Sequence, residues 1–108
     1  MNATMILNRA EELREELIEN RRTLHSYAET GFDLPQTTAF VEKKLREYGL
    51  TPVRCGKAGI TCVIGDPKKG KCFLLRGDMD ALPIFEESGE VFASEVPGKM
   101  HGCGHDMH

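Results

Sequence analysis

The stretch KCFLLRGDMD, residues 71–80, decides how the chain is expected to fold. Four apolar residues follow one another from Cys72 to Leu75 without alternating with polar ones. A strand of this kind is covered on both faces, as in the middle of a sheet that carries helices on each side. Asp78 and Asp80 follow where open α/β sheets bind their ligands, at the end of a strand. The stretch therefore predicts an α/β fold with a polar site at this strand end.

Two amphipathic helices are expected before this strand. Apolar residues recur at spacings of four, three, four and seven over residues 5–26, which places them on one stripe of a helix: Ile6, Ala10, Leu13, Leu17 and Leu24. A second helix is expected from Pro35, which suits a first helical position, to Gly49, which suits the position after a helix end. Each apolar stripe requires another element to cover it.

Short β-type segments lie between the second helix and the central strand. TPVRC (51–55), GITCVIG (59–65) and KCFLLR (71–76) have strand-type composition. DPKKG (66–70) between two of them predicts a β-hairpin that joins 59–65 to 71–76. Residues 84–99 are expected to form a polar loop, and no repeat or linker divides the chain.

Composition limits the class of protein. The 108 residues are 40% hydrophobic and 29% charged with a net charge of −3, which is typical of one small globular domain or part of one. Basic residues are interspersed with acidic ones, so no nucleic-acid surface is predicted. No apolar run approaches the ~20 residues of a membrane span, and no signal peptide is evident. We expect a cytoplasmic protein without membrane or nucleic-acid partners.

The four cysteines form neither a C-x-x-C pair nor a zinc-finger pattern, which argues against a redox protein. Cys55, Cys62 and Cys72 are interpreted as small apolar residues on strands. Cys103 differs because of the residues around it.

The stretch MHGCGHDMH, residues 100–108, holds three of the four histidines, one cysteine and one aspartate. In a loop or strand, the spacing of Cys103 and His105 presents a thiolate and an imidazole on the same side, because side chains alternate with period two. These ligands suit Zn²⁺ and also accept Mn²⁺, Co²⁺ or Ni²⁺. Histidines on a surface are often only solvated, but this density of ligand types favours a metal site.

Asp78 and Asp80 are a second candidate pair. Their spacing lets both carboxylates face one cavity as metal ligands, as groups that orient a ligand histidine, or as acid/base groups. Taken alone, such a pair is more often found as turn residues or helix caps. Pro83 restricts the backbone shortly after Asp80, which favours a shaped site.

The strings LLRGDMDALPIFEESG (74–89) and GKMHGCGHDMH (98–108) closely resemble the metal-dependent amidohydrolase family of hippurate hydrolases, N-acyl-amino-acid deacylases and indole-acetyl-amino-acid hydrolases. This family is part of the wider group of aminoacylase and carboxypeptidase G-type metallopeptidases. RRTLHSYAETGF (21–32) and AGITCVIG (58–65) extend the resemblance to nearly the whole chain. The resemblance implies that residues 1–108 are the N-terminal portion of a helix-flanked mixed-sheet catalytic domain, without the remainder of that domain and a dimerising lid domain.

The resemblance also implies a reaction and its residues. The reaction is hydrolysis of the amide bond in an N-acyl amino acid, or of a related peptide-like bond, at a centre with two divalent ions. Cys103 and His105 match metal ligands, and Asp80 matches the aspartate that orients the site. Asp78 stands where wider relatives have a histidine ligand, so a supporting role is expected for it.

Three further residues of the motif, His101, Asp106 and His108, are expected to support the site, whereas His25 is given no catalytic role. In the family, the general base and further ligands follow the position of His108. We therefore expect the chain alone to be inactive, to expose apolar surface, and to belong to a longer protein that forms homo-oligomers. The alternative is a non-catalytic metal-binding or interaction module that keeps only the start of the fold.

Overall fold

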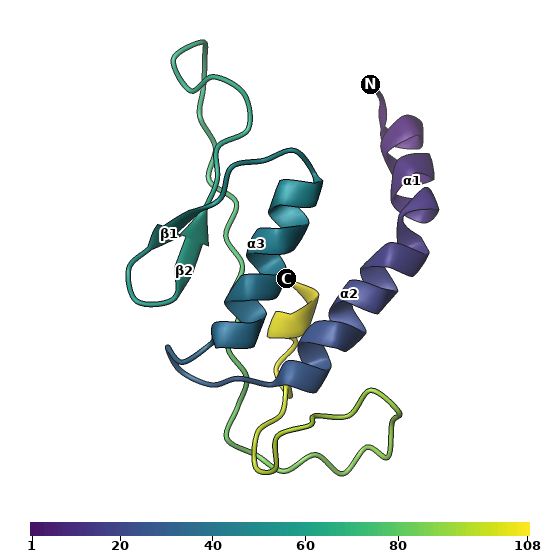
Figure 1. Cartoon of the computed structure of the whole chain (residues 1–108). Helices are drawn as coiled ribbons and strands as arrows, with labels where there is room; N and C mark the ends of the chain where they lie inside the picture. The colour runs from purple at the N-terminus through teal and green to yellow at the C-terminus, as the bar shows by residue number, and fades with distance from the viewer.

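The computed structural model describes residues 1–108 and contains three α-helices, one two-stranded sheet and a short 3-10 helix. The elements are α1 (Ala3–Glu12), α2 (Arg14–Tyr27), α3 (Pro35–Glu47), β1 (Val53–Cys55), β2 (Gly59–Thr61) and the 3-10 helix η1 (His105–Met107). Helix α1 leads into α2, and both α3 and η1 pack against α2 (Figure 1). The β1–β2 hairpin lies on the side of α3 that faces away from α2 (Figure 1). No helix is both long enough and apolar enough to cross a membrane.

The single helix expected over residues 5–26 is divided at Leu13, which is a turn residue between α1 and α2. Asn2 caps α1 with its side-chain oxygen, which accepts a hydrogen bond from the amide of Met5 at 3.0 Å. The expected apolar stripe is only partly covered, and Ile6 and Leu17 are 57% and 54% exposed. Its N-terminal part stays exposed because α1 contacts no element other than α2.

Helix α3 begins at Pro35 as expected, and it is capped by a residue from before the helix. Leu34 occupies the N-cap position and has no polar side chain with which to bond the free amides. The buried carboxylate of Glu29 accepts hydrogen bonds from the amides of Gln36 at 3.1 Å and Thr37 at 2.6 Å. This remote cap ties the end of α2 to the start of α3.

The predicted hairpin between residues 59–65 and 71–76 is wrong. Instead, β1 pairs with β2 in antiparallel register, with Val53 opposite Thr61. Residues 66–70 still turn, and the Asp66 carboxylate accepts a hydrogen bond from the amide of Lys68 at 2.9 Å. The turn is therefore stabilised by a local hydrogen bond, but no paired strand follows it.

The strand expected at residues 72–75 is also not formed. Phe73, Leu74 and Leu75 are 83%, 88% and 96% exposed, and no strand pairs with this segment. A central strand requires neighbouring strands on both edges, and the sheet of this chain has only two short strands. The expectation of exposed apolar surface is confirmed at this segment.

Polar residues are more numerous than apolar ones in the buried interior. The buried apolar residues are Ala28, Leu34, Ala58 and Ala81, and the buried polar residues are His25, Glu29, Thr37, Thr38, His101 and Asp106. Single β-bridges connect Thr30 with Ala81 and Leu82 with Met100. These bridges bring the segment after Asp80 and the histidine-rich end of the chain next to the end of α2.

Candidate metal centre

His105 is fixed by Asp80 at the start of η1. Its Nδ1 lies 3.0 Å from the backbone carbonyl oxygen of Asp80 and 3.0 Å from its Oδ1. Because both oxygens accept hydrogen bonds, Nδ1 of a neutral His105 ring carries the proton and Nε2 keeps a free lone pair. Histidines that bind metals are commonly oriented in this way by a carboxylate or a carbonyl.

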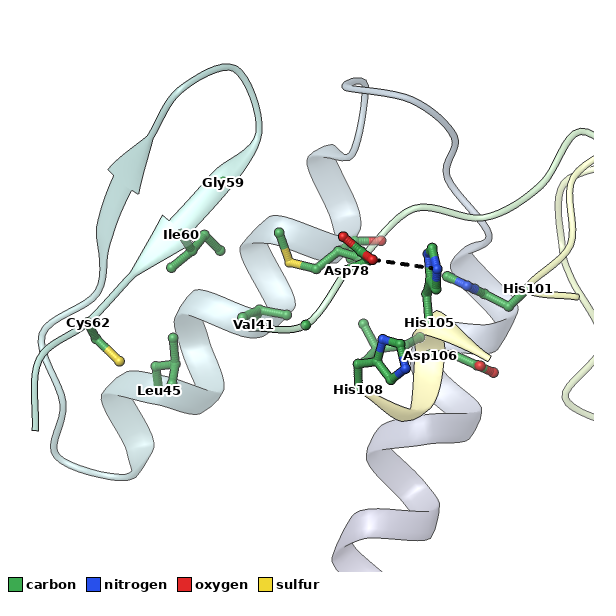
Figure 2. A pocket seen from close by; sticks show the side chains of 14 residues that line it. Val41, Leu45, Gly59, Ile60, Cys62, Asp78, His101, His105, Asp106 and His108 are labelled. Carbon is green, nitrogen blue, oxygen red and sulfur yellow. Dashed lines mark ion pairs between the residues drawn. The ribbon is translucent and has the colours of Figure 1, made fainter. Parts of the chain in front are cut away.

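Asp78, His105 and His108 form a cluster whose candidate ligand atoms all lie within 4.8 Å of one another. Nε2 of His105 is 3.7 Å from Oδ2 of Asp78, and the two imidazole rings have centroids 5.4 Å apart. Figure 2 shows the Asp78 carboxylate directed at His105, with His108 beside it. We refer to these three residues as the Asp-His-His cluster.

The Asp-His-His cluster fits a divalent ion by its donor chemistry, since two imidazoles and one carboxylate suit Zn²⁺ or Mn²⁺. Gly77 contributes by having no side chain, because a Cβ there would lie 2.9 Å from Cβ of His108. Arg76 forms an ion pair with Asp78 at 2.6 Å, and its side chain is 74% exposed. A metal ion would therefore compete with a solvated guanidinium for Asp78.

Cys103 is exposed and does not belong to the Asp-His-His cluster. Gly104, between Cys103 and His105, has φ of +107°, and His105 begins η1, so the two residues do not follow the alternation of an extended strand. His108, for which the sequence suggests only a supporting role, lies in the cluster. The structure thus brings together Asp78, Asp80, His105 and His108, with Cys103 outside this group.

Asp106 is buried and faces α2. Its Oδ2 lies 2.7 Å from Nδ1 of His25 and 2.9 Å from Nε of Arg21. The other ring nitrogen of His25, Nε2, lies 2.9 Å from Oε1 of Glu86. We call Arg21, His25, Glu86 and Asp106 the buried ionic network. Sequence reasoning missed its first three members, because a helical arginine and an acidic loop residue ordinarily face solvent.

The pKa of Glu86 lies below its ordinary value. Burial acts to raise this pKa, but hydrogen bonds from the Ser88 hydroxyl, the Ser94 amide and His25 outweigh that effect. The amide of Ser94 donates at 2.8 Å. Glu86 is therefore held as a carboxylate next to His25.

His101 is buried, and neither of its ring nitrogens has a hydrogen-bond partner. Burial lowers the pKa of His101 and so favours its neutral form. The ring lines a cavity of about 300 Å³ whose walls include apolar residues of α2, α3 and β2 (Figure 2). The Asp-His-His cluster lines the same cavity, which therefore has both an apolar and a polar wall.

Comparison with known proteins shows which family the chain resembles. Residues 74–108 match the model of peptidase family M20/M25/M40. A solved structure from Bacillus subtilis, a dinuclear metal binding peptidase from the M20 family, is 36% identical and superposes on 91% of this chain with a TM-score of 0.83. A structure from methicillin-resistant Staphylococcus aureus is 33% identical over 97% of the chain, with a TM-score of 0.89. The chain is thus similar in sequence and in fold to the N-terminal part of M20 peptidases.

Curated relatives with enzyme names share this segment. N-acetyl-L-cysteine deacetylase of Bacillus subtilis is 43% identical over 98 residues, and N-acyl-L-amino acid amidohydrolase of Geobacillus stearothermophilus is 39% identical over 99. These alignments cover 89% and 91% of this chain but 23% and 27% of the relatives. A Rhodococcus jostii protein with a glutamate–cysteine ligase name is 44% identical over 98% of this chain and 14% of its own length.

The chain thus spans between 14% and 28% of the relatives and solved structures it matches. Its fold is consistent with the N-terminal portion of the α/β fold of M20 peptidases, as the sequence led us to expect. The ligase name belongs to a protein of which the shared segment is only a seventh, so that name does not describe this segment specifically. The Bacillus and Geobacillus relatives carry the names of enzymes that act on acylated amino acids.

Proposed function

We propose that this sequence is the first part of the catalytic domain of a metal-dependent amidohydrolase. The complete enzyme would hydrolyse the amide bond of N-acyl amino acids or of related peptide-like molecules. Residues 1–108 form part of one domain, and the general base and further ligands come from the rest of the protein. The family match at residues 74–108 and the names of the relatives support this substrate class.

The single observation that carries the proposal is the orientation of His105. Oδ1 of Asp80 accepts a hydrogen bond from Nδ1 of His105 at 3.0 Å, and Nε2 of His105 faces the carboxylate of Asp78. Such an arrangement has a clear use in metal binding, because it fixes the tautomer and raises the basicity of the ligand nitrogen. It also joins the two sequence motifs, since Asp80 and His105 come from different ones.

We assign His105 and, from the family resemblance alone, Cys103 as metal ligands, and Asp80 as the residue that orients His105. Asp78 and His108 support the same centre and are near enough to contribute donor atoms. His101 and Asp106 support the surrounding structure. The complete site would hold two divalent ions of Zn, Mn, Co or Ni, which supply an activated water and polarise the scissile carbonyl.

Three further parts of the proposal concern the activity of this chain and the assembly and location of the complete enzyme. The 108-residue chain alone lacks hydrolase activity, because the general base and further metal ligands come from the rest of the protein. The complete enzyme works as a homo-oligomer. It acts in the cytoplasm, which is supported by four cysteines that are all unpaired.

The ligand assignment is tested on the purified 108-residue chain by competitive titration with Zn²⁺ and Mn²⁺ and by mass spectrometry of bound metal. We expect His105→Ala to weaken metal binding at least about 100-fold and Cys103→Ser about 10-fold or more. Cys72→Ser is the matched control, because Cys72 is an exposed cysteine away from the cluster, and it should bind as the unsubstituted chain does. Unchanged stoichiometry in both His105→Ala and Cys103→Ser contradicts the assignment.

Activity is tested on the full-length protein that contains this sequence, with N-acetyl amino acids as substrates. We expect release of the free amino acid that stops on chelation and returns with added Mn²⁺ or Zn²⁺. Metal binding without hydrolysis would instead identify a non-catalytic metal-binding module. Hydrolysis by residues 1–108 alone would contradict the proposal that they are an incomplete site.

A further inference from the structure

The buried ionic network connects three segments that are far apart in the sequence. Arg21 and His25 lie on α2, Glu86 lies in the loop before the histidine motif, and Asp106 lies in η1. The side chains of His25, Glu86 and Asp106 are only 3%, 5% and 1% exposed. Both ring nitrogens of His25 face a carboxylate, so this residue bridges the loop and η1.

Asp106 is the only buried residue of η1. Met107, the apolar residue of this short helix, is 75% exposed and gives it no apolar anchor. The position of η1 therefore depends on polar contacts, namely those of His105 with Asp80 at its start and those of Asp106 with α2. His105 lies directly before Asp106 and His108 two residues after it, so a rotation of η1 would move both rings of the Asp-His-His cluster.

The His25 ring is itself held in place by packing. Phe92 contacts it edge to face with centroids 5.6 Å apart. The guanidinium groups of Arg21 and Arg22 lie 5.3 Å and 4.9 Å from the centroid of Phe92 and cover that ring. His25 thus offers Asp106 a hydrogen-bond donor in a fixed place.

We infer that His25 is a positioning residue for the metal centre, which acts by holding Asp106 and, through it, His105 and His108. The inference rests on the proposed function, because it requires the cluster to bind a metal ion. Residues that orient ligands from outside the coordination sphere typically change metal affinity by about 10-fold to 100-fold when they are replaced. The role of His25 in metal affinity should therefore be separable from its role in stability.

Two substitutions separate the two bonds of His25. The amide of Asn reaches about as far as Nδ1, so His25→Asn keeps a donor for Asp106 and loses the one for Glu86. The longer Gln reaches about as far as Nε2, so His25→Gln keeps the donor for Glu86 and loses the one for Asp106. Each variant keeps one of the two contacts that the imidazole makes with a carboxylate, and their unfolding midpoints should be lowered to a similar extent.

The dissociation constant for Mn²⁺ is measured for both variants of the 108-residue chain, together with urea unfolding followed by circular dichroism. We expect His25→Gln to weaken Mn²⁺ binding about 10-fold and His25→Asn less than about 3-fold. Glu12→Gln, which changes a carboxylate on the exposed face of α1, is the surface control and should leave affinity and stability unchanged.

Equal Mn²⁺ affinities for the two variants and the unsubstituted chain would overturn the inference. It would also be overturned if the loss of Mn²⁺ affinity in each variant simply followed its loss of unfolding free energy. Failure of the full-length protein that contains this sequence to bind Mn²⁺ would instead contradict the proposed function. If both His25 variants fail to fold, Arg21→Gln provides the test, because Arg21 pairs with the same oxygen of Asp106 and its side chain is 35% exposed. We expect that variant to fold and to weaken Mn²⁺ binding about 3-fold to 10-fold, and unchanged binding would overturn the inference.

Discussion

The region around η1 and the segment at residues 71–76 differ in whether their side chains find partners within the chain. Near η1, buried polar groups such as His25 and Asp106 are bonded to one another within the chain. In residues 71–76, the apolar side chains of Leu74 and Leu75 are almost fully exposed. Hydrogen bonds and ion pairs between nearby segments can thus form in this chain, whereas burial of a central strand requires neighbouring strands that the chain does not supply.

The largest contrast is expected between two leucines from these regions. Leu34 is 5% exposed, so Leu34→Ala should lower the free energy of unfolding by about 3 kcal/mol. Leu75 is 96% exposed, so Leu75→Ala should change it by less than about 0.5 kcal/mol. Urea unfolding followed by circular dichroism measures both. Similar losses for the two variants would mean that residues 71–76 are buried, contrary to the structure.

The next largest effect is expected at the remote cap of α3. Glu29→Ala removes the acceptor for the amides of Gln36 and Thr37 and should lower the free energy of unfolding by about 2 kcal/mol. Glu29→Gln keeps one acceptor oxygen and should lose about half as much. The same urea unfolding experiment tests both variants. An unchanged stability for Glu29→Ala would show that these amides find other partners.

Two adjacent buried threonines should respond in opposite directions. The hydroxyl of Thr38 donates to the carbonyl oxygen of Leu34 at 2.7 Å, so Thr38→Val should cost about 1 kcal/mol. The hydroxyl of Thr37 is buried without a partner, so Thr37→Val should be neutral or should stabilise by up to about 1 kcal/mol. Thermal unfolding of the two variants is the measurement. A loss of stability in both would indicate that Thr37 is bonded to a buried water.

The smallest effect is the pH dependence that arises from Glu86. Because the pKa of Glu86 is lowered in the folded chain, its contribution to stability is present above the unfolded value of about 4.3 and is lost as pH falls through the folded pKa. Glu86→Gln removes this contribution. Unfolding free energies measured from pH 6 to pH 3 should therefore fall less steeply for the variant. Parallel profiles would exclude Glu86 as a source of acid sensitivity.

The sequence predicted well those elements that depend on local signals. Pro35 predicted the start of α3, and the D-M-D and H-G-C-G-H strings predicted the family match at residues 74–108. Oδ1 of Asp80 lies 3.0 Å from Nδ1 of His105, whereas the orienting role of Asp80 stays a prediction. These features could be predicted because each is encoded by adjacent residues or by a specific motif.

Features that depend on distant contacts could not be predicted in this way. The break at Leu13 lies within a continuous helical pattern that has no glycine or proline. The hairpin was placed one strand too late, because strand composition does not reveal which segments pair. The buried ionic network requires α2, the loop and η1 to meet, and an isolated arginine or glutamate gives no sign of this.

Glu29 has a consequence for the order in which the chain folds. Its carboxylate bonds amides only seven and eight residues further on, whereas its carbonyl oxygen accepts a hydrogen bond from Ala81 at 2.7 Å. Contacts between residues near in sequence close short loops and form earlier than those that close long ones. We expect the pair of helices to form first around Glu29, and the segment with both aspartates to dock onto it afterwards. The same residue would thus serve as an early nucleus and as a late docking point.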